Sequence, residues 1–141
     1  MKRAVIVYRS QTGTTRALAE EIGRFLASHD VESQVVSVGE CDVTALGEVD
    51  YLLLGCWTSG LFVVGQHPDQ PWVDFTRAMP TITRPRIGLF TTYRLLTGSM
   101  FARMRRHMEG RAPAPTLELK SRSSQLTEPN RRALERFIAT A

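Results

Sequence analysis

The sequence predicts an α/β protein, a three-layer sandwich in which helices cover both faces of a five-stranded parallel sheet. Strand-sized apolar segments alternate with segments of helical periodicity along all 141 residues, as expected for an open parallel sheet. Apolar residues make up 43% of the chain and charged residues 23%, which are the proportions of an ordinary globular protein. We therefore expect one domain over residues 1–141 with strand order 2-1-3-4-5.

The first part of the chain is predicted to form three strands and two helices. Residues 4–8 and 51–56 are apolar throughout, as expected for strands buried on both faces. Residues 31–38 form a strand with less burial between them. Residues 14–28 are predicted helical because their apolar side chains recur on one face. Residues 71–79 begin with a proline, which the first turn of a helix tolerates.

The remainder of the chain repeats the alternation. Residues 86–91 and 117–119 are predicted strands, and residues 99–109 are a predicted helix with methionines and Phe101 on its inner face. The last helix is expected over residues 127–139, because Thr127 is a suitable N-cap before an apolar stripe.

A hydroxyl-rich segment follows the first predicted strand. In parallel sheets of this kind, ligands bind beyond the carboxyl ends of the strands. Four of the six residues from Ser10 to Thr15 carry hydroxyls, and hydroxyls with backbone N–H groups at a helix start can bind phosphate. Neither GxxxxGK[ST] nor GxGxxG is present. The alternative is a cluster of residues that only caps the helix.

The spacing Ser-x-Thr-Gly-x-Thr in this segment resembles the FMN phosphate loop of the flavodoxin family, and the resemblance in fold extends over essentially the whole chain. It implies a flavodoxin-like sheet and FMN as the cofactor, with the first loop around the FMN phosphate and two later loops around the isoalloxazine ring. The implied phosphate-loop residues are Ser10, Gln11, Thr12, Gly13, Thr14 and Thr15.

Two further loops follow the third and fourth predicted strands. The resemblance implies that Trp57 flanks the ring, whereas packing against a neighbouring helix is the alternative. The third loop is similar to that of a short bacterial flavodoxin-like subgroup and lacks the Gly- and Asp-rich pattern common in the family. The implied ring-binding residues are Cys56, Trp57, Thr58, Ser59 and Gly60 in the second loop, and Thr91, Thr92, Tyr93, Thr97, Gly98 and Ser99 in the third.

Charge is distributed unevenly along the chain. Residues 1–83 carry 6 basic and 10 acidic side chains, whereas residues 84–141 carry 12 basic and 4 acidic ones. We expect the basic half to lie on one side of the flavin and to stabilise its reduced, anionic form, which makes a milder reductant than an acidic flavodoxin. The same charge predicts redox partner proteins with an acidic docking face. No apolar run approaches the roughly 20 residues of a membrane span, and we expect a cytoplasmic protein.

The predicted function is an FMN-binding electron carrier, and two alternatives stay open. One is an FMN-dependent oxidoreductase acting on a quinone, a nitro compound or a porphyrinogen, with residues 61–70 lining its substrate pocket. The other is a flavin-free basic binding module that uses the arginines of the 99–109 helix and its flank, although no nucleic-acid-binding motif accompanies them and an ordinary solvated helix face explains them too. These arginines are Arg103, Arg105, Arg106 and Arg111.

Overall fold

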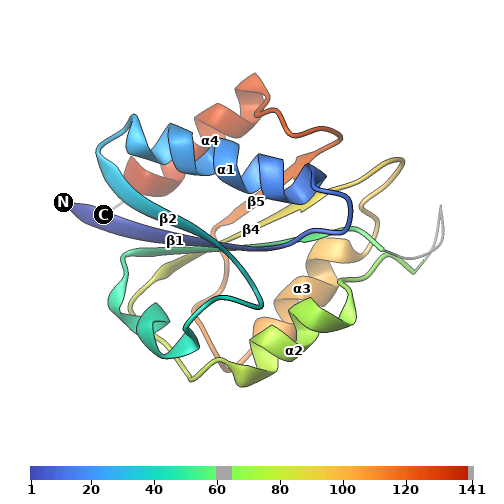
Figure 1. Cartoon of the computed structure of the whole chain (residues 1–141), viewed down its shortest axis with the longest axis horizontal. Helices are drawn as coiled ribbons and strands as arrows, with labels where there is room; N and C mark the ends of the chain where they lie inside the picture. The colour runs from blue at the N-terminus through green and yellow to red at the C-terminus, as the bar shows by residue number, and fades with distance from the viewer. Residues whose placement is uncertain (60–64, 140–141) are drawn as a thin grey trace.

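The computed structural model describes residues 1–59 and 65–139, and within them it contains one five-stranded sheet with helices on both faces (Figure 1). The strand order is β2-β1-β3-β4-β5 and every neighbouring pair is parallel, which confirms the predicted fold. The strands are β1 (Lys2–Arg9), β2 (Val31–Ser37), β3 (Tyr51–Trp57), β4 (Arg86–Thr92) and β5 (Leu117–Ser121). The helices are α1 (Thr14–Ala27), the 3-10 helix η1 (Val43–Glu48), α2 (Gln70–Ala78), α3 (Met100–Met108) and α4 (Glu128–Ala139).

Each predicted strand and helix forms, and the observed elements differ from the predicted ranges at their ends. Strands β1 and β5 extend beyond the predicted ranges because backbone pairing continues into polar residues at their ends. The short helix η1 was not predicted. The Asp42 side chain accepts a hydrogen bond from Thr44 N at 3.0 Å at its start, and Leu46 anchors it in the core.

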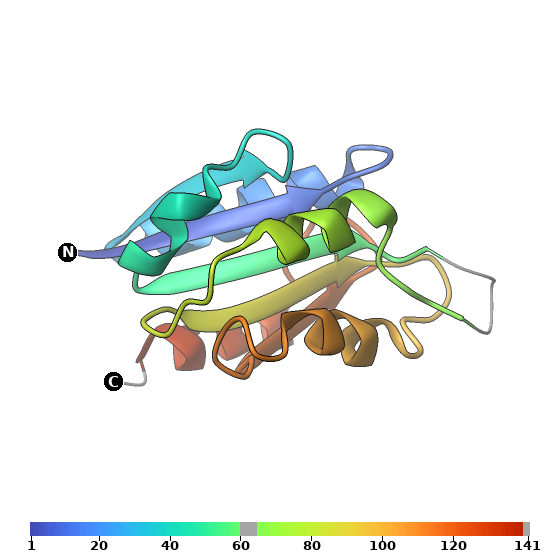
Figure 2. The ribbon, with the colours of Figure 1, turned by 90° about the horizontal axis from the view of Figure 1, so that it is seen from below.

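Two separate apolar layers explain the continuous apolar runs of the central strands. Alternate residues of β1 and β3 point to opposite faces, so that Ile6 and Leu53 pack under α1 and α4 while Val7 and Leu54 pack against η1, α2 and α3 (Figures 1 and 2). Both faces of the sheet are therefore covered, as the apolar runs require.

Two local features support the predicted elements. Thr127 caps α4, since its Oγ1 accepts a hydrogen bond from Asn130 N at 3.3 Å. Gly55 in β3 lies against the Phe90 ring, and a Cβ at this position would come within 2.1 Å of that ring. The expected inward packing of Phe101 is only partly realised, because its side chain is half-buried at the edge of the core.

Parallel pairing brings the carboxyl ends of β1, β3 and β4 to one edge of the sheet. Arg9 pairs with Cys56, and Trp57 pairs with Thr92. The loops that leave these strands therefore start side by side (Figure 2), and the candidate site lies where they meet.

Candidate functional site

The first loop turns sharply into α1. Gly13 has a φ of +97°, which favours glycine, and its N–H donates to Ser10 Oγ at 2.9 Å. No described side chain caps the first turn of α1, so the hydroxyls of this loop are not explained by helix capping. Because the first N–H groups of a helix have no acceptor within it, the start of α1 is suited to an anion.

The threonines of the first loop divide between two roles. Thr12 and Thr14 line a pocket, with their Oγ1 atoms 3.5 Å apart. Thr15 is buried, and its Oγ1 lies 2.6 Å from Thr92 Oγ1 at the end of β4. The Thr15 hydroxyl therefore joins the first loop to the third.

The second loop contributes one wall of the same pocket. Trp57, Thr58 and Ser59 line it, and the Trp57 indole N–H donates to Asp69 Oδ2 at 2.8 Å. Ser59 pairs with His67 through two backbone hydrogen bonds of 3.1 and 2.9 Å. The predicted contact at Gly60 falls outside the described residues.

Cys56 and Thr91 lie outside the described pocket lining. Thr91 Oγ1 donates to the Cys56 carbonyl at 2.6 Å and lies 2.8 Å from Thr58 Oγ1. Burial raises the pKa of the Cys56 thiol well above its ordinary value, so this thiol stays protonated and acts as a small apolar side chain. The Thr91 hydroxyl therefore connects the ends of β3 and β4, from which the second and third loops leave.

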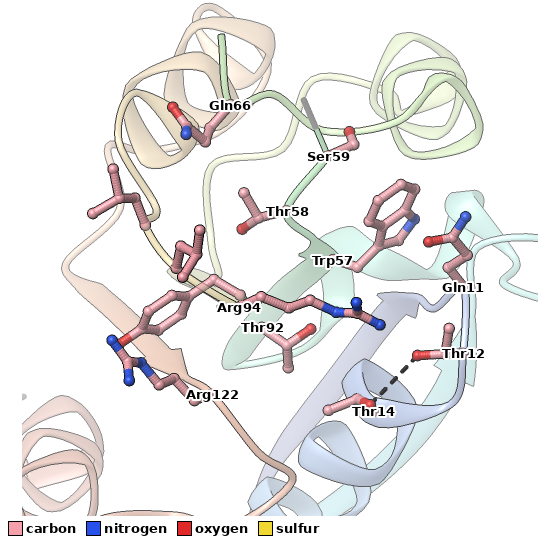
Figure 3. Close-up of a pocket in the computed structure, with 13 residues that line it drawn as sticks. Gln11, Thr12, Thr14, Trp57, Thr58, Ser59, Gln66, Thr92, Arg94 and Arg122 are labelled. Carbon is pink, nitrogen blue, oxygen red and sulfur yellow. Dashed lines mark hydrogen bonds between the residues drawn. The ribbon is translucent and has the colours of Figure 1, made fainter. Parts of the chain in front are cut away.

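The third loop carries aromatic, cationic and apolar groups. Thr92 and Tyr93 line the pocket with Arg94, and Leu95 and Leu96 follow at its mouth with exposures of 50% and 47%. In Figure 3 the Arg94 side chain extends from this loop across the pocket toward the side lined by Gln11 and Trp57. The loop thus brings positive charge to the pocket.

The end of the third loop contacts the segment that follows the second loop. Thr97, Gly98 and Ser99 do not contribute to the pocket lining. Ser99 Oγ donates instead to the Gln66 carbonyl at 3.0 Å, which ties the start of α3 to the segment after the second loop. The buried Gln66 itself lines the pocket.

Together the three loops enclose a pocket of about 400 Å³ (Figure 3), within the range of small-molecule sites. The lining combines hydroxyls near a helix start with the aromatic rings of Trp57 and Tyr93, and no aspartate or glutamate occurs in its described part. This chemistry suits a flat aromatic ligand with a phosphate. The described lining residues are Gln11, Thr12, Thr14, Trp57, Thr58, Ser59, Gln66, Thr92, Tyr93, Arg94, Leu95, Leu96 and Arg122.

The structure brings eight of the predicted site residues into this pocket and adds others that the motif did not include. Arg122 was missed because it follows β5, far along the chain, and only the sheet brings it near Tyr93, with its Cζ 5.6 Å from the ring centroid. Leu95 and Leu96 had a signal in the sequence, as two adjacent leucines between polar segments. The eight are Gln11, Thr12, Thr14, Trp57, Thr58, Ser59, Thr92 and Tyr93.

Residues 1–59 and 65–139 contain neither a metal cluster nor a membrane-spanning helix. No group of three or more His, Cys, Asp or Glu side chains there is arranged to hold a metal ion. No helix within the same ranges has the length and apolar character needed to cross a bilayer.

A nucleotide-binding, doubly wound α/β protein is the class that this fold and site define. The family model described as flavodoxin matches residues 6–96. The chain belongs to the flavodoxin family. This assignment confirms the predicted family.

Individual relatives agree with the family assignment. A flavodoxin of Megasphaera elsdenii is 31% identical over 88 residues, which span 62% of this chain and 63% of that protein, so the aligned part is just under two thirds of the relative's length. The solution structure of the two-electron reduced Megasphaera elsdenii flavodoxin superimposes with a TM-score of 0.76 at 22% identity, covering 98% of this chain and 99% of the other. A Fusobacterium nucleatum flavodoxin solved with bound flavin mononucleotide has a TM-score of 0.62 at 15% identity over 99% and 96% of the two chains.

Proposed function

We propose that this flavodoxin holds FMN in the three-loop pocket and carries electrons between redox partner proteins. The observation that carries this proposal is the pairing of an uncapped helix start, beside Thr12 and Thr14, with the aromatic side chains Trp57 and Tyr93 in one pocket. The first group would bind the phosphate, and the second would flank the ring. FMN supplies the electron chemistry when bound, and the protein supplies binding, orientation and electrostatics.

The direct test is titration of the flavin-free protein with FMN and, in parallel, with riboflavin, which lacks the phosphate. Absorption bands at about 370 and 450 nm report the flavin. We expect FMN to bind about 100-fold more tightly than riboflavin, because several hydrogen bonds to a charged group are lost without the phosphate. Equal affinity for the two ligands would contradict the role assigned to the first loop, and no binding of FMN would overturn the proposed function.

We further propose that the pocket stabilises the reduced, anionic form of FMN. Arg94 and Arg122 line the pocket, and the described lining contains no acidic side chain. Lys120 adds a third cation, with its Nζ 5.9 Å from the Tyr93 ring centroid. A positive environment favours a ligand that gains negative charge on reduction. The bound flavin would therefore be a milder reductant than in a flavodoxin with acidic surroundings.

The same cations support an acidic docking face on the protein partner. Arg94 and Arg122 line the same pocket as the exposed Leu95 and Leu96, a combination suited to a partner with apolar and acidic groups. Electron transfer from the reduced protein to ferricyanide, an anion, should slow as salt rises, and transfer to hexaammineruthenium(III), a cation, should accelerate. The opposite salt dependence would contradict a positive docking face.

The basic module predicted as an alternative loses much of its support, because most of its arginines bind within the chain. Arg105 pairs with Glu118, Arg103 donates to Ser99, and Arg111 donates to the carbonyls of Arg77 and Met79. Direct oxidation of NAD(P)H by the purified protein, without a partner, would favour the oxidoreductase alternative. The predicted cytoplasmic location remains a proposal, to be checked by fractionation.

A further inference from the structure

The carboxylate of Asp69 connects the ends of two strands beside the pocket. Its Oδ2 accepts hydrogen bonds from the Trp57 indole Nε1 and from Arg9 Nε, each at 2.8 Å, and its Oδ1 lies 3.5 Å from Cys56 Sγ. The Asp69 side chain is only 14% exposed. Three residues from β1 and β3 thus meet at one carboxylate.

Asp69 also occupies a backbone position at which its side chain would be expected to make other contacts. Asp69 is the N-cap residue of α2, where an aspartate ordinarily bonds the first N–H groups of the helix, yet its side chain makes no capping hydrogen bond. The carboxylate is directed instead toward Trp57 and Arg9. Its local role is therefore not the support of α2.

We propose that Asp69 is a positioning residue that fixes the Trp57 indole in the orientation in which it flanks the flavin, while Arg9 neutralises the carboxylate. This inference rests on the proposed function, because it assigns the flavin as the group that Trp57 faces. A carboxylate that is mostly buried requires a paired cation, and Arg9 supplies it. Asp69 then acts on the flavin through the position of the Trp57 indole, because Arg9 neutralises the carboxylate charge.

Four variants separate these effects. Asp69→Ala removes both the charge and the acceptor of the indole hydrogen bond, whereas Asp69→Asn removes the charge and keeps an acceptor oxygen. Trp57→Phe keeps an aromatic ring without the indole N–H. Asp74→Ala is the matched control, since Asp74 is an exposed carboxylate on the same helix whose side chain accepts from Gln70 Nε2 at 2.7 Å.

We expect Asp69→Ala to weaken FMN binding about tenfold, as for the loss of one hydrogen bond to a charged group. Asp69→Asn should stay within about threefold of the unmodified protein, because its amide oxygen still accepts the indole N–H. In the Trp57→Phe background, Asp69→Ala should add no more than about twofold, and Asp74→Ala should have no effect. Equal losses in Asp69→Ala and Asp69→Asn, or an undiminished loss in the Trp57→Phe background, would overturn the proposal.

A second readout does not depend on flavin binding. The chain has two tryptophans, so the ¹H–¹⁵N spectrum of the flavin-free protein has two indole signals, and the one absent from Trp57→Phe belongs to Trp57. Asp69→Ala should shift this signal and speed its exchange with solvent, whereas Asp74→Ala should not. An unmoved Trp57 signal overturns the positioning role. Failure of the unmodified protein to bind FMN, with the signal shifted, overturns the proposed function alone.

Discussion

The first and third loops of the pocket leave β1 and β4, the strands on either side of β3, yet they are built differently. Residues 10–15 are uncharged, and a turn at Gly13 leads directly into an uncapped helix. Residues 91–99 place Arg94 and two exposed leucines at the mouth of the pocket. A neutral loop at a helix start is suited to binding a phosphate through backbone N–H groups, whereas a loop with charge is suited to tuning a cofactor and to contacting partners.

The difference between the two loops predicts that FMN affinity and the reduction potential of bound FMN depend on different parts of the pocket. If the first loop anchors FMN, changes in it should alter binding more than reduction potential. If the third loop tunes FMN, changes in it should alter the potential more than binding. The two loops also touch through Thr15 and Thr92, so the division of roles is tested best by variants on each side and at the contact.

The largest effect is expected at the turn of the first loop. Gly13→Ala places a side chain at a φ of +97° where nothing lies within 4 Å of the new Cβ, so the cost is backbone strain alone, about 1–2 kcal/mol. Relaxation of the turn should weaken FMN binding by about 10- to 30-fold, measured by fluorescence titration.

Gly110 provides the matched control for this variant. It has a φ of +76° after α3, a Cβ added there would also have nothing within 4 Å, and it does not line the pocket. Gly110→Ala should lower the free energy of unfolding by a similar amount and leave FMN binding unchanged. A loss of FMN affinity shared by both variants would mean that global strain, rather than the first loop, controls binding.

An intermediate effect is expected where the two loops touch. Thr15→Val leaves the buried Thr92 hydroxyl without its 2.6 Å partner and should lower the free energy of unfolding of the flavin-free protein by about 1–2 kcal/mol. In the Thr15→Val background, Thr92→Val should lower the free energy of unfolding by less than it does in the unmodified protein, because it removes the hydroxyl that Thr15→Val leaves unpaired. Urea unfolding of the two single variants and the double variant measures this coupling, and strictly additive costs would show that the contact does not join the loops.

The smallest effect is expected at the third loop. Arg94→Gln removes a cation at the pocket and should lower the reduction potential of bound FMN by about 20–40 mV, the one-electron equivalent of about 0.5–1 kcal/mol. FMN affinity of the oxidised protein should change little. Spectroelectrochemistry measures the potential.

Arg84→Gln is the control for the charge itself, because Arg84 precedes β4 at the opposite edge of the sheet and pairs with Asp50 at 3.3 Å. It removes the same charge and should leave the potential unchanged. An equal shift in both variants would mean that net charge, and not the third loop, sets the potential.

The alternation of strands and helices and the first loop could be predicted from the sequence, because each depends on residues that are close together in the chain. Buried strands are apolar throughout, and the turn into α1 needs its glycine and hydroxyls within six consecutive residues. For the third loop, the sequence predicted pocket-lining residues at its start but not at its end, since Thr92 and Tyr93 line the pocket while Thr97 and Ser99 do not. Which residues of a loop face a cavity depends on where the following helix packs.

The sequence by itself therefore determined the fold class, the strand order and the family. Only the tertiary structure decided that Thr15 bonds Thr92, that Arg122 reaches the pocket and that Asp69 holds Trp57. These pairs are separated by 77 residues for the threonines and 12 for Asp69 and Trp57. The physical reason is that such contacts depend on strand register and helix packing, which no local pattern of side chains specifies.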